Sequence, residues 1–535
     1  MGKRRLSSSE AESEVNFSDS DDGSYASKEP KPRVKATTRC RTTNKRTKRD
    51  LGTVNDDSSA TQPRPLAVSS HAKAIHAIRA EGVAPIRAAL LKWYSTVHAS
   101  RNMPWRKPFD LTLNREERAQ RAYEVWISEI MLQQTQVATV IPYYNRWMEK
   151  YPTIRDLAGA SIDQVNSLWK GLGYYSRASR LLVGAQKAVA EYAGRLPDNA
   201  KDMQSKIPGI GRYSAGAICS IAYGENVPVL DGNVNRLLSR FLALHAPPKA
   251  KTTLDILWNA AGAMVQNLAS IEYPGDVNQA LIELGSTVCK VRDPDCASCP
   301  LRPWCAAHAT PMPVSDIEDL CTLCEPLVGE AGATAYPMRA DKKKSREELD
   351  IVHVLEWRNG SDRQFLLVRR PEGGLLAGLD EFPTSPNVAA STSKARQLKI
   401  AQEIVPTFLH GSARLQDVAG DSDGSGASAS LRIAKVQPVG DVLHVFSHIR
   451  KTYRVQWVLL EGGVVPPQLA IASVLEENEN LKKGAGKGKV KNRKPEGSTV
   501  VPVSTWVPLD AVAARNIGTG VVKVWNLCKM LWEEE

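Results

Sequence analysis

Four cysteines lie close together in this chain and constrain its fold more than any other feature. Their spacing is Cys289-x6-Cys296-x2-Cys299-x5-Cys305. Thiolates this close on a short loop can surround one iron–sulfur cube, and ligation by cysteine alone suits a [4Fe–4S] cluster. Zinc sites more often pair two CxxC knuckles or include histidine. We therefore predict that the four cysteines hold a [4Fe–4S] cluster, with a zinc site and structural thiols as the alternatives.

The composition narrows the class of protein. The chain has 535 residues, nine cysteines and a formal net charge of +12. This length fits two or three domains, and the positive charge favours a nucleic acid over a membrane as partner. The few cysteines and the lack of an apolar N-terminal stretch argue against a secreted protein held by disulfides. No apolar run reaches transmembrane length, so we expect a soluble monomer without a membrane partner.

Residues 1–70 are rich in Ser, Lys, Arg and Asp and have no periodic apolar positions. We expect them to form a disordered, basic N-terminal tail. Within the tail, the stretch from Lys28 to Arg49 has ten basic residues and one acid. Such a stretch is typical of a nuclear-localisation signal or of a non-specific DNA-binding arm. The acidic residues near the N-terminus argue against a mitochondrial presequence, so the predicted location is the nucleus, and a mitochondrial form stays open.

The rest of the chain divides by the period of its apolar residues. From 80 to 308 these positions recur every three to four residues, which predicts an all-α core of about ten short helices. After a connector at 309–346, alternating β-branched runs predict an α+β domain over 347–530. Two polar stretches of that domain, near 420–430 and 470–497, are typical of surface insertions.

One connection in the helical core has the form of a helix–hairpin–helix. In Ile207-Pro-Gly-Ile-Gly-Arg212, Gly209 and Gly211 allow backbone amides to approach a DNA phosphate at the start of the next helix. An ordinary glycine-containing connection is the alternative. Asp231 follows in Leu230-Asp-Gly-Asn-Val-Asn235 and makes the pattern more specific.

The hairpin and the aspartate together resemble the helix–hairpin–helix (endonuclease III) glycosylase superfamily. Further segments resemble the MutY-type adenine DNA glycosylases, including the eukaryotic MutY homologs: Val125–Val137, Gly171–Tyr175, Leu375–Leu379 and Phe446–His448. The resemblance covers about 85–310 strongly and 350–530 in patches. It implies a DNA N-glycosylase of base excision repair with a [4Fe–4S] cluster. Such an enzyme flips and excises adenine that is mispaired with 8-oxoguanine or guanine in double-stranded DNA.

Two carboxylates would divide the work of breaking the N-glycosidic bond. Glu129 has apolar neighbours in the sequence, which should raise its pKa and suit a general acid. By resemblance, Glu129 protonates N7 of adenine and then helps to activate water. Also by resemblance, Asp231 stays ionised beside the sugar and Asn233 helps to order the site. The alternatives are a glutamate that faces solvent or an arginine, and a turn aspartate, because Asp-Gly is a favoured turn pair.

Tyr213 distinguishes two mechanisms. The endonuclease III-like relatives that cut DNA through a Schiff base have a lysine just after the hairpin, and a tyrosine hydroxyl cannot form an imine with an abasic sugar. We therefore predict a monofunctional glycosylase with Tyr213 in its catalytic site. The rivals are a bifunctional glycosylase with lyase activity and a non-catalytic lesion-binding scaffold. The presence of both Glu129 and Asp231 argues against the scaffold.

Five further residues match family positions that contact DNA. Extruding the target base costs a few kcal/mol of pairing and stacking, and Gln134 and Tyr174 match the positions that insert near the orphaned partner base. Without this match, an aromatic residue at 174 would be assigned to core packing. Phe446, Ser447 and His448 match the loop that inspects 8-oxoguanine, with a polar hairpin turn as the alternative.

The C-terminal domain resembles the Nudix-like domain of the same family. It lacks the glutamate-rich helix with which Nudix hydrolases hold magnesium, so we expect no pyrophosphate hydrolysis. The family usually has a tryptophan where this chain has Asp380. We expect this difference to loosen the local packing.

The connector contains a second pair of cysteines, Cys321 and Cys324, with the spacing of a metal knuckle. Two thiolates do not complete a zinc site, and the eukaryotic relatives use a third cysteine and an upstream histidine there. This chain has no third cysteine at that place, although His71 and His76 lie upstream. Zinc is therefore one hypothesis, and two reduced thiols are the favoured one. Nearby, Ile317-Glu318 resembles the family's docking point for the checkpoint sliding clamp.

Overall fold

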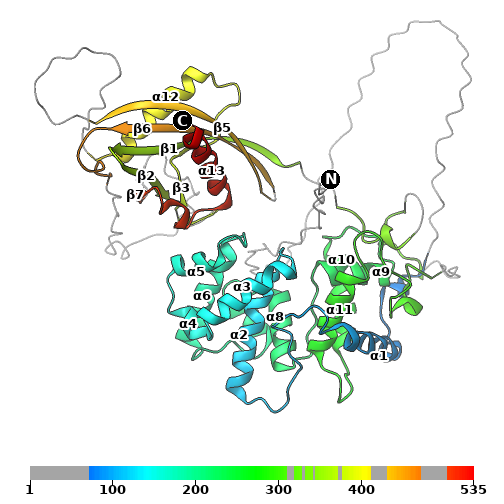
Figure 1. The fold of residues 1–535 in the computed structure, drawn as a ribbon. Helices are drawn as coiled ribbons and strands as arrows, with labels where there is room; N and C mark the ends of the chain where they lie inside the picture. The colour runs from blue at the N-terminus through cyan, green and yellow to red at the C-terminus, as the bar shows by residue number, and fades with distance from the viewer. Residues whose placement is uncertain are drawn as a thin grey trace, which may run out of the picture. The chain divides into compact units, whose positions relative to one another are not determined.

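The computed structural model describes residues 71–309, 319–327, 332–340, 344–371, 376–410, 431–446, 448–470 and 503–534 (Figure 1). The predicted tail at 1–70 lies outside these residues, as do the predicted insertion at 420–430 and all but the first residue of the one predicted at 470–497. The chain divides into two compact units. The first combines Met1–His98 with Asn226–Ala340, and the second combines Ala99–Glu225 with Asp341–Glu535.

The described part of the first unit is helical. It contains α1 (Ala80–Val97), α9 (Gly232–Phe241), α10 (Lys251–Val265) and α11 (Pro274–Thr287), with the short helices η1 (Lys73–His76), η3 (Arg302–Trp304) and η5 (Ala333–Ala335). Helix α11 packs against the other three α-helices. Leu90, Leu257 and Leu281 are buried on α1, α10 and α11, so apolar stripes at helical spacing form this core.

The second unit begins with a group of helices. These are α2 (Arg115–Leu132), α3 (Val137–Lys150), α4 (Ile154–Ala158), α5 (Ile162–Trp169), α6 (Ser176–Glu191), α7 (Ala200–Lys206), α8 (Arg212–Ile218) and η2 (Cys219–Tyr223). Asn114, Thr153 and Ser161 each begin a helix with a capping box, which satisfies free amides at the helix start. The all-α region predicted from the sequence is therefore confirmed. No helix among the described residues is long and apolar enough to cross a membrane.

A mixed sheet forms the rest of the second unit. Its strands are β1 (Arg346–Asn359), β2 (Asp362–Arg369), β3 (Asp380–Glu381), β4 (Thr384–Ser385), β5 (Arg432–Val445), β6 (Ile449–Glu461) and β7 (Ser504–Pro508). The order is β3-β2-β1-β6-β5; β4 pairs with β1, β7 pairs with β2, and β1 and β6 run parallel.

Helices cover both faces of this sheet, α13 (Thr519–Glu534) on one and α12 (Lys394–Ile404) on the other (Figure 1). Val354 packs in the core cluster that contains Trp525 of α13. The next residue of β1, Leu355, packs in the cluster that contains Ala401 of α12. Neighbouring residues of one strand thus face opposite layers, as the period of a strand requires. This arrangement confirms the predicted α+β domain.

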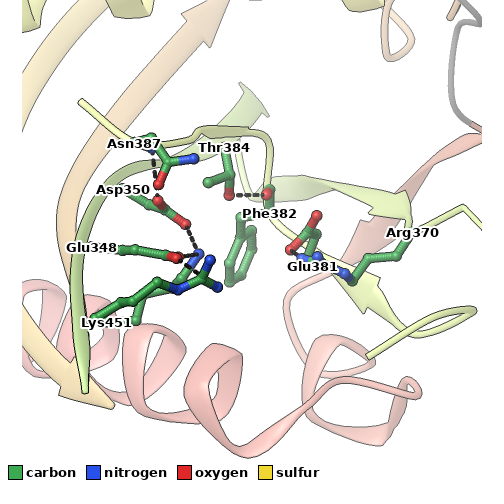
Figure 2. A network of polar contacts seen from close by, with 9 residues as sticks. Glu348, Asp350, Arg370, Glu381, Phe382, Thr384, Asn387 and Lys451 are labelled. Atoms are coloured by element: carbon green, nitrogen blue, oxygen red, sulfur yellow. Dashed lines mark hydrogen bonds and ion pairs between the residues drawn. The ribbon is translucent and has the colours of Figure 1, made fainter. Parts of the chain in front are cut away.

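A partly buried polar network joins β1 to β6 (Figure 2). The Lys451 ammonium lies 3.1 Å from Glu348 and 2.7 Å from Asp350. Asp350 also accepts a 3.0 Å hydrogen bond from the backbone N–H of Asn387. Paired charges of this kind offset the unfavourable burial of each charge. The network fixes the start of the parallel β1–β6 pair, just beyond the loop that contains Phe446 and His448.

Asp380 stands where the family that the sequence resembles usually has a tryptophan. Its side chain is buried, and its carboxylate lies 3.3 Å from the Arg515 guanidinium. Its backbone N–H donates to the carbonyl of Asn516 at 2.9 Å. Burial raises the pKa of the Asp380 carboxyl, and the charge of Arg515 opposes that rise. An ion pair and a backbone hydrogen bond thus hold Asp380 in place. The sequence had led us to expect looser packing at this position.

Candidate active site and metal centres

Glu129 lies on the buried face of α2. It is 8% exposed, and its neighbours Trp126 and Ile130 on the same helix are also buried. The hydroxyl of Tyr213, on α8, donates a 2.7 Å hydrogen bond to Oε2 of Glu129. The structure therefore places Glu129 away from solvent and joins it to a second residue that the sequence had assigned to the catalytic site.

The hairpin between α7 and α8 has a geometry that requires glycine. Gly209 has φ +81°, and a Cβ atom there would lie 2.7 Å from Cβ of Arg180. Any other residue would be strained in this left-handed conformation and would also collide with that side chain. Gly211 precedes α8 as its N-cap, with no side chain to cap the helix. The hairpin fixes the start of α8, and Tyr213 is the second residue of that helix.

Asp231 is the N-cap of α9. Its Oδ1 accepts a hydrogen bond from the backbone N–H of Val234 at 2.7 Å, and its Oδ2 accepts one from Nδ2 of Asn233 at 2.9 Å. Burial raises the pKa of the Asp231 carboxyl, and these two bonds and the charge of Arg236 oppose the rise. The capping position therefore holds the carboxylate in one orientation, within a largely desolvated environment.

Arg236 connects this aspartate to the cysteine loop. Its Nη2 donates to Oδ1 of Asn233 at 2.9 Å and to the carbonyl of Gly285 at 2.6 Å, and its Nε donates to the carbonyl of Cys289 at 3.0 Å. Arg236 was not among the site residues predicted from the sequence. Its spacing of three residues from Asn233 on a helix was the available signal, but the contact with Cys289 depends on how α9 and α11 pack.

The four cysteines line one pocket. Its walls include Leu237, Phe241, Val288 and Leu301 together with Cys289, Cys296, Cys299 and Cys305. Four thiol donors around one pocket fit an iron–sulfur cube. Burial, and more weakly the neighbouring thiols, raise the pKa of Cys305 to about 11.

Arg240 forms hydrogen bonds to the first residues of the loop that contains the four cysteines. This arginine is 2% exposed. Its Nη1 donates to the carbonyl of Lys290 at 2.6 Å and to Sγ of Cys289 at 3.3 Å, and its Nη2 donates to the carbonyl of Val291 at 3.1 Å. Hydrogen bonds to a ligand sulfur are among the contacts that orient and tune such centres.

A second group of ligand-type side chains gathers at the connector. The side-chain ligand atoms of His71, His76, Cys321 and Cys324 all lie within 4.8 Å of one another. Nε2 of His76 is 3.3 Å from Sγ of Cys321 and 3.4 Å from Sγ of Cys324, while its Nδ1 bonds the carbonyl of Leu242 at 2.8 Å. The sequence favoured two unliganded thiols here. The structure instead brings together two histidines and two thiols, a donor set that suits zinc.

Gln134 and Tyr174 share an unusual backbone conformation. Gln134 has φ +53° and Tyr174 has φ +49°, a region that residues other than glycine seldom adopt. Both side chains are exposed, and the large aromatic Tyr174 is 47% exposed. Residue 174 is therefore not a core position, which was the alternative to a DNA contact.

The loop between β5 and β6 contains two described residues of the predicted lesion-reading motif. The backbone N–H of Phe446 donates to the carbonyl of Ile449 at 2.8 Å. The Phe446 ring packs edge-on against His444, with centroids 4.5 Å apart, and His448 is exposed. Ser447 lies outside the described residues, as do Ile317 and Glu318 of the predicted clamp contact.

These features define a class of protein. Residues 127–261 match the HhH-GPD superfamily of base excision DNA repair proteins. Among solved structures, a thermostable thymine-DNA glycosylase is similar, with 24% sequence identity and a TM-score of 0.35; the match covers 42% of this chain and 94% of that one.

Two characterised relatives narrow the class to one family. The human adenine DNA glycosylase is 40% identical over 435 residues, which are 76% of this chain and 74% of the human protein. The fission yeast (Schizosaccharomyces pombe) adenine DNA glycosylase is 34% identical over 422 residues, which are 74% of this chain and 86% of that protein. The chain belongs to the adenine DNA glycosylase family, and it is a DNA N-glycosylase of base excision repair.

Proposed function

We propose that this enzyme flips adenine out of duplexes in which it is mispaired with 8-oxoguanine or guanine and hydrolyses its N-glycosidic bond with acid assistance. The observation that carries this proposal is the buried Glu129 carboxyl with the Tyr213 hydroxyl bonded to Oε2. A single oriented carboxyl in an apolar surrounding suits proton transfer to the leaving base. In this role Glu129 protonates N7 of adenine and afterwards accepts a proton from the attacking water, while Tyr213 holds the carboxyl in place.

The second carboxyl has a different task. Bond breaking leaves positive charge on the sugar, and a fixed carboxylate stabilises that charge more effectively than mobile water. Asp231 is held at the N-terminus of α9 by Val234 and Asn233. We assign it the role of ionised stabiliser, with Asn233 as the residue that keeps its orientation.

The product is an uncut strand with an abasic site. Tyr213 stands just after the hairpin, where a lyase has its lysine, and a hydroxyl cannot form a Schiff base. Borohydride should therefore trap no covalent adduct between the protein and damaged DNA. An adduct that survives Tyr213→Phe and is lost with a nearby lysine would favour the bifunctional alternative.

Several residues serve recognition in this proposal. Gln134 and Tyr174 insert beside the orphaned base, and the hairpin amides around Gly209 and Gly211 bind a backbone phosphate. The exposed, left-handed conformation at 134 and 174 supports insertion, because strained exposed residues are common at functional sites.

The loop that connects β5 and β6 reads the lesion opposite adenine. Phe446 offers a stacking face to 8-oxoguanine, while Ser447 and His448 offer hydrogen bonds. The exposure of His448 and the edge-on packing of Phe446 on His444 support this assignment. We expect His448→Ala to weaken the preference for 8-oxoguanine over guanine, with competitive duplex binding as the measurement.

Each of the two groups of ligands suits its own metal centre. We assign a [4Fe–4S] cluster to Cys289, Cys296, Cys299 and Cys305. When bound, the cluster supplies a rigid support for the loop and takes no part in proton transfer. The exposed Lys290 and Arg292 on this loop then bind DNA phosphate. We assign zinc to the group of His71, His76, Cys321 and Cys324, where the ion would tie η1 to the connector.

Two further proposals rest on sequence alone. The connector binds a ring-shaped sliding clamp through Ile317 and Glu318, which a pull-down with purified clamp would test against the double alanine variant. The basic stretch Lys28–Arg49 directs the protein to the nucleus, and a reporter fused to residues 1–60 that stays wholly cytoplasmic would contradict this.

The main test is single-turnover release of adenine from an adenine:8-oxoguanine duplex by wild type and Glu129→Gln. We expect at least about a hundredfold loss of rate with duplex binding retained. Glu124→Gln is the matched control, because Glu124 lies on the same helix but pairs with Lys107 and Arg121, and its rate should stay close to wild type. A wild-type protein that binds the duplex without releasing adenine would instead favour a lesion-binding scaffold.

A further inference from the structure

A buried arginine forms hydrogen bonds to the C-terminal end of the helix that contains Glu129. Arg177, on α6, is 7% exposed. Its Nη1 donates to three carbonyls at the C-terminal end of α2, those of Ile130 at 2.8 Å, Met131 at 3.1 Å and Gln133 at 2.6 Å. These carbonyls lack helical partners and carry the negative end of the helix dipole. The guanidinium therefore acts as a cationic cap for α2.

The same guanidinium also forms hydrogen bonds to the loop between α5 and α6. Its Nη2 donates to the carbonyl of Gly173 at 3.1 Å and to that of Leu172 at 3.4 Å. Its central carbon lies 5.2 Å from the centre of the Trp169 ring and 5.4 Å from that of the Tyr174 ring. One rigid, planar group thus bridges the segment that leads to Gln134 and the segment that contains Tyr174.

Two of the carbonyls bonded by Arg177 affect the backbone conformation of the residues that follow them. The carbonyl of Gln133 belongs to the peptide group that precedes Gln134, and the carbonyl of Gly173 belongs to the one that precedes Tyr174. The orientation of the preceding peptide group determines φ of a residue, so Arg177 restrains φ at both positions. Both φ angles are left-handed and would relax toward more favourable values without such restraint.

Capping a helix end with a buried arginine costs free energy, because the charge loses its hydration. Among the described residues, no carboxylate is paired with the guanidinium of Arg177, and burial lowers its pKa to about 10. A buried charge without a counter-charge contributes little to stability. Such a group is better explained by the conformation that it imposes.

We propose that Arg177 is a positioning residue that holds Gln134 and Tyr174 in register, so that both side chains enter the duplex together when adenine is flipped. This inference rests on the proposed insertion of Gln134 and Tyr174. Arg177 itself acts through the two loops and has no contact with the reacting atoms in this assignment. Its substitution should therefore impair the flipping step before it impairs chemistry.

The chain offers a close structural control in Arg87, which is 2% exposed and caps the end of α10. Arg87 donates to the carbonyls of Gln266 at 3.0 Å and Asn267 at 3.1 Å. Asn267 also has a left-handed φ, of +50°. Unlike Arg177, Arg87 also has a carboxylate partner, Glu272 at 2.8 Å. Arg87→Met therefore removes a buried arginine cap in the other compact unit, and it should lower thermal stability without changing the coupling to Tyr174.

The test follows flipping directly in the full-length protein. A duplex with 2-aminopurine in place of the target adenine, opposite 8-oxoguanine, becomes more fluorescent when that base leaves the stack. Stopped-flow traces would compare wild type with Arg177→Met, Arg177→Lys, Tyr174→Ala and the double variant Arg177→Met/Tyr174→Ala. Thermal unfolding of each protein sets a temperature at which all are folded.

We expect Tyr174→Ala and Arg177→Met each to slow the fluorescence rise at least about fivefold, and the double variant to be no slower than the worse single one. Arg177→Lys should resemble Arg177→Met, since one ammonium cannot bridge both loops, and it retains the charge if the methionine variant folds poorly. Arg87→Met should give a wild-type trace.

Three outcomes would overturn the inference while leaving the proposed insertion by Tyr174 in place. The first is a wild-type trace for Arg177→Met when Tyr174→Ala is slow, and the second is full rescue by Arg177→Lys. The third is a double variant whose defect is the product of the two single defects, which would mean that Arg177 and Tyr174 act independently. A wild-type trace for Tyr174→Ala would instead remove the proposed insertion by Tyr174, and the inference with it.

Discussion

The hydroxyl of Tyr213 donates a 2.7 Å hydrogen bond to Oε2 of Glu129, which lies 84 positions earlier in the chain. Tyr213 is fixed by the hairpin, because the turn at Gly209 sets the start of α8. The motif that is proposed to bind a DNA phosphate therefore also positions the residue that orients the acid. A disturbance of the hairpin should affect chemistry as well as binding.

Removing the hydroxyl of Tyr213 should slow base release with little effect on binding. A hydrogen bond to an ionisable group contributes about 1.5–3 kcal/mol, so we expect Tyr213→Phe to lower the single-turnover rate roughly 10- to 100-fold. Tyr223→Phe is the control, because the partner of that hydroxyl among the described residues is a backbone carbonyl, that of Leu196 at 3.1 Å, within the same set of helices. Equal rate losses in the two variants would mean that the Glu129 contact has no special role.

Asp231→Asn should raise the stability of the protein and lower its rate of adenine release. Because burial raises the native pKa of this carboxyl, its contribution to stability is present at low pH and is lost as the pH rises through the native pKa. The neutral variant should therefore unfold at a higher temperature than wild type near pH 7, with the difference shrinking toward about pH 4. Its adenine release should fall roughly 100- to 1,000-fold.

Circular dichroism melts across that pH range, with rates at each pH, check the prediction for Asp231. The wild-type rate should rise with pH through the same raised pKa, since the ionised form is the active one. A variant that is less stable than wild type at neutral pH, or a stability difference that ignores pH, would contradict the role of burial.

Two helical glycines should respond in opposite ways to alanine. A Cβ atom at Gly285 would lie 2.7 Å from the carbonyl oxygen of Asn233, whereas one at Gly262 would meet nothing within 4 Å. Gly262→Ala should stabilise the protein by up to ~1 kcal/mol through helix propensity. Gly285→Ala should destabilise it by about 1–3 kcal/mol and also slow adenine release, because it displaces the residue that orients Asp231.

Urea unfolding and single-turnover rates measured together separate the two effects at Gly285. A loss of stability with an unchanged rate would show that Asn233 can move without disturbing Asp231. That result would remove Asn233 from the catalytic assignment.

The two metal centres should be separable by composition. Purified protein should contain about four iron atoms and one zinc atom per chain. His76→Ala should abolish zinc and leave iron unchanged, because His76 lies 3.3 Å and 3.4 Å from the two connector thiols. Cys299→Ser should do the reverse, with loss of the visible absorbance of the cluster. Elemental analysis gives the measurement, and zinc-free wild-type protein would refute the connector site.

Much of this protein could be predicted from short stretches of sequence. The helical period of 80–308, the spacing of Cys289 to Cys305 and the glycines of the hairpin each reflect a local physical requirement. Gly209 is an example, because a left-handed turn that closes on Arg180 has room only for hydrogen at that position. Requirements of this kind are written within a few residues, so a sequence shows them directly.

The contacts between segments that are distant in the sequence could be found only in the folded structure. The sequence contains His71 and His76 some 245 positions before Cys321, and only tertiary structure decided that these side chains share one site. The same holds for Arg236 at the carbonyl of Cys289 and for Arg177 between two loops. Hydrophobic burial drives such packing without direction, so sequence alone determined the kinds of helix, strand and motif, while close packing of their side chains determined which polar groups meet.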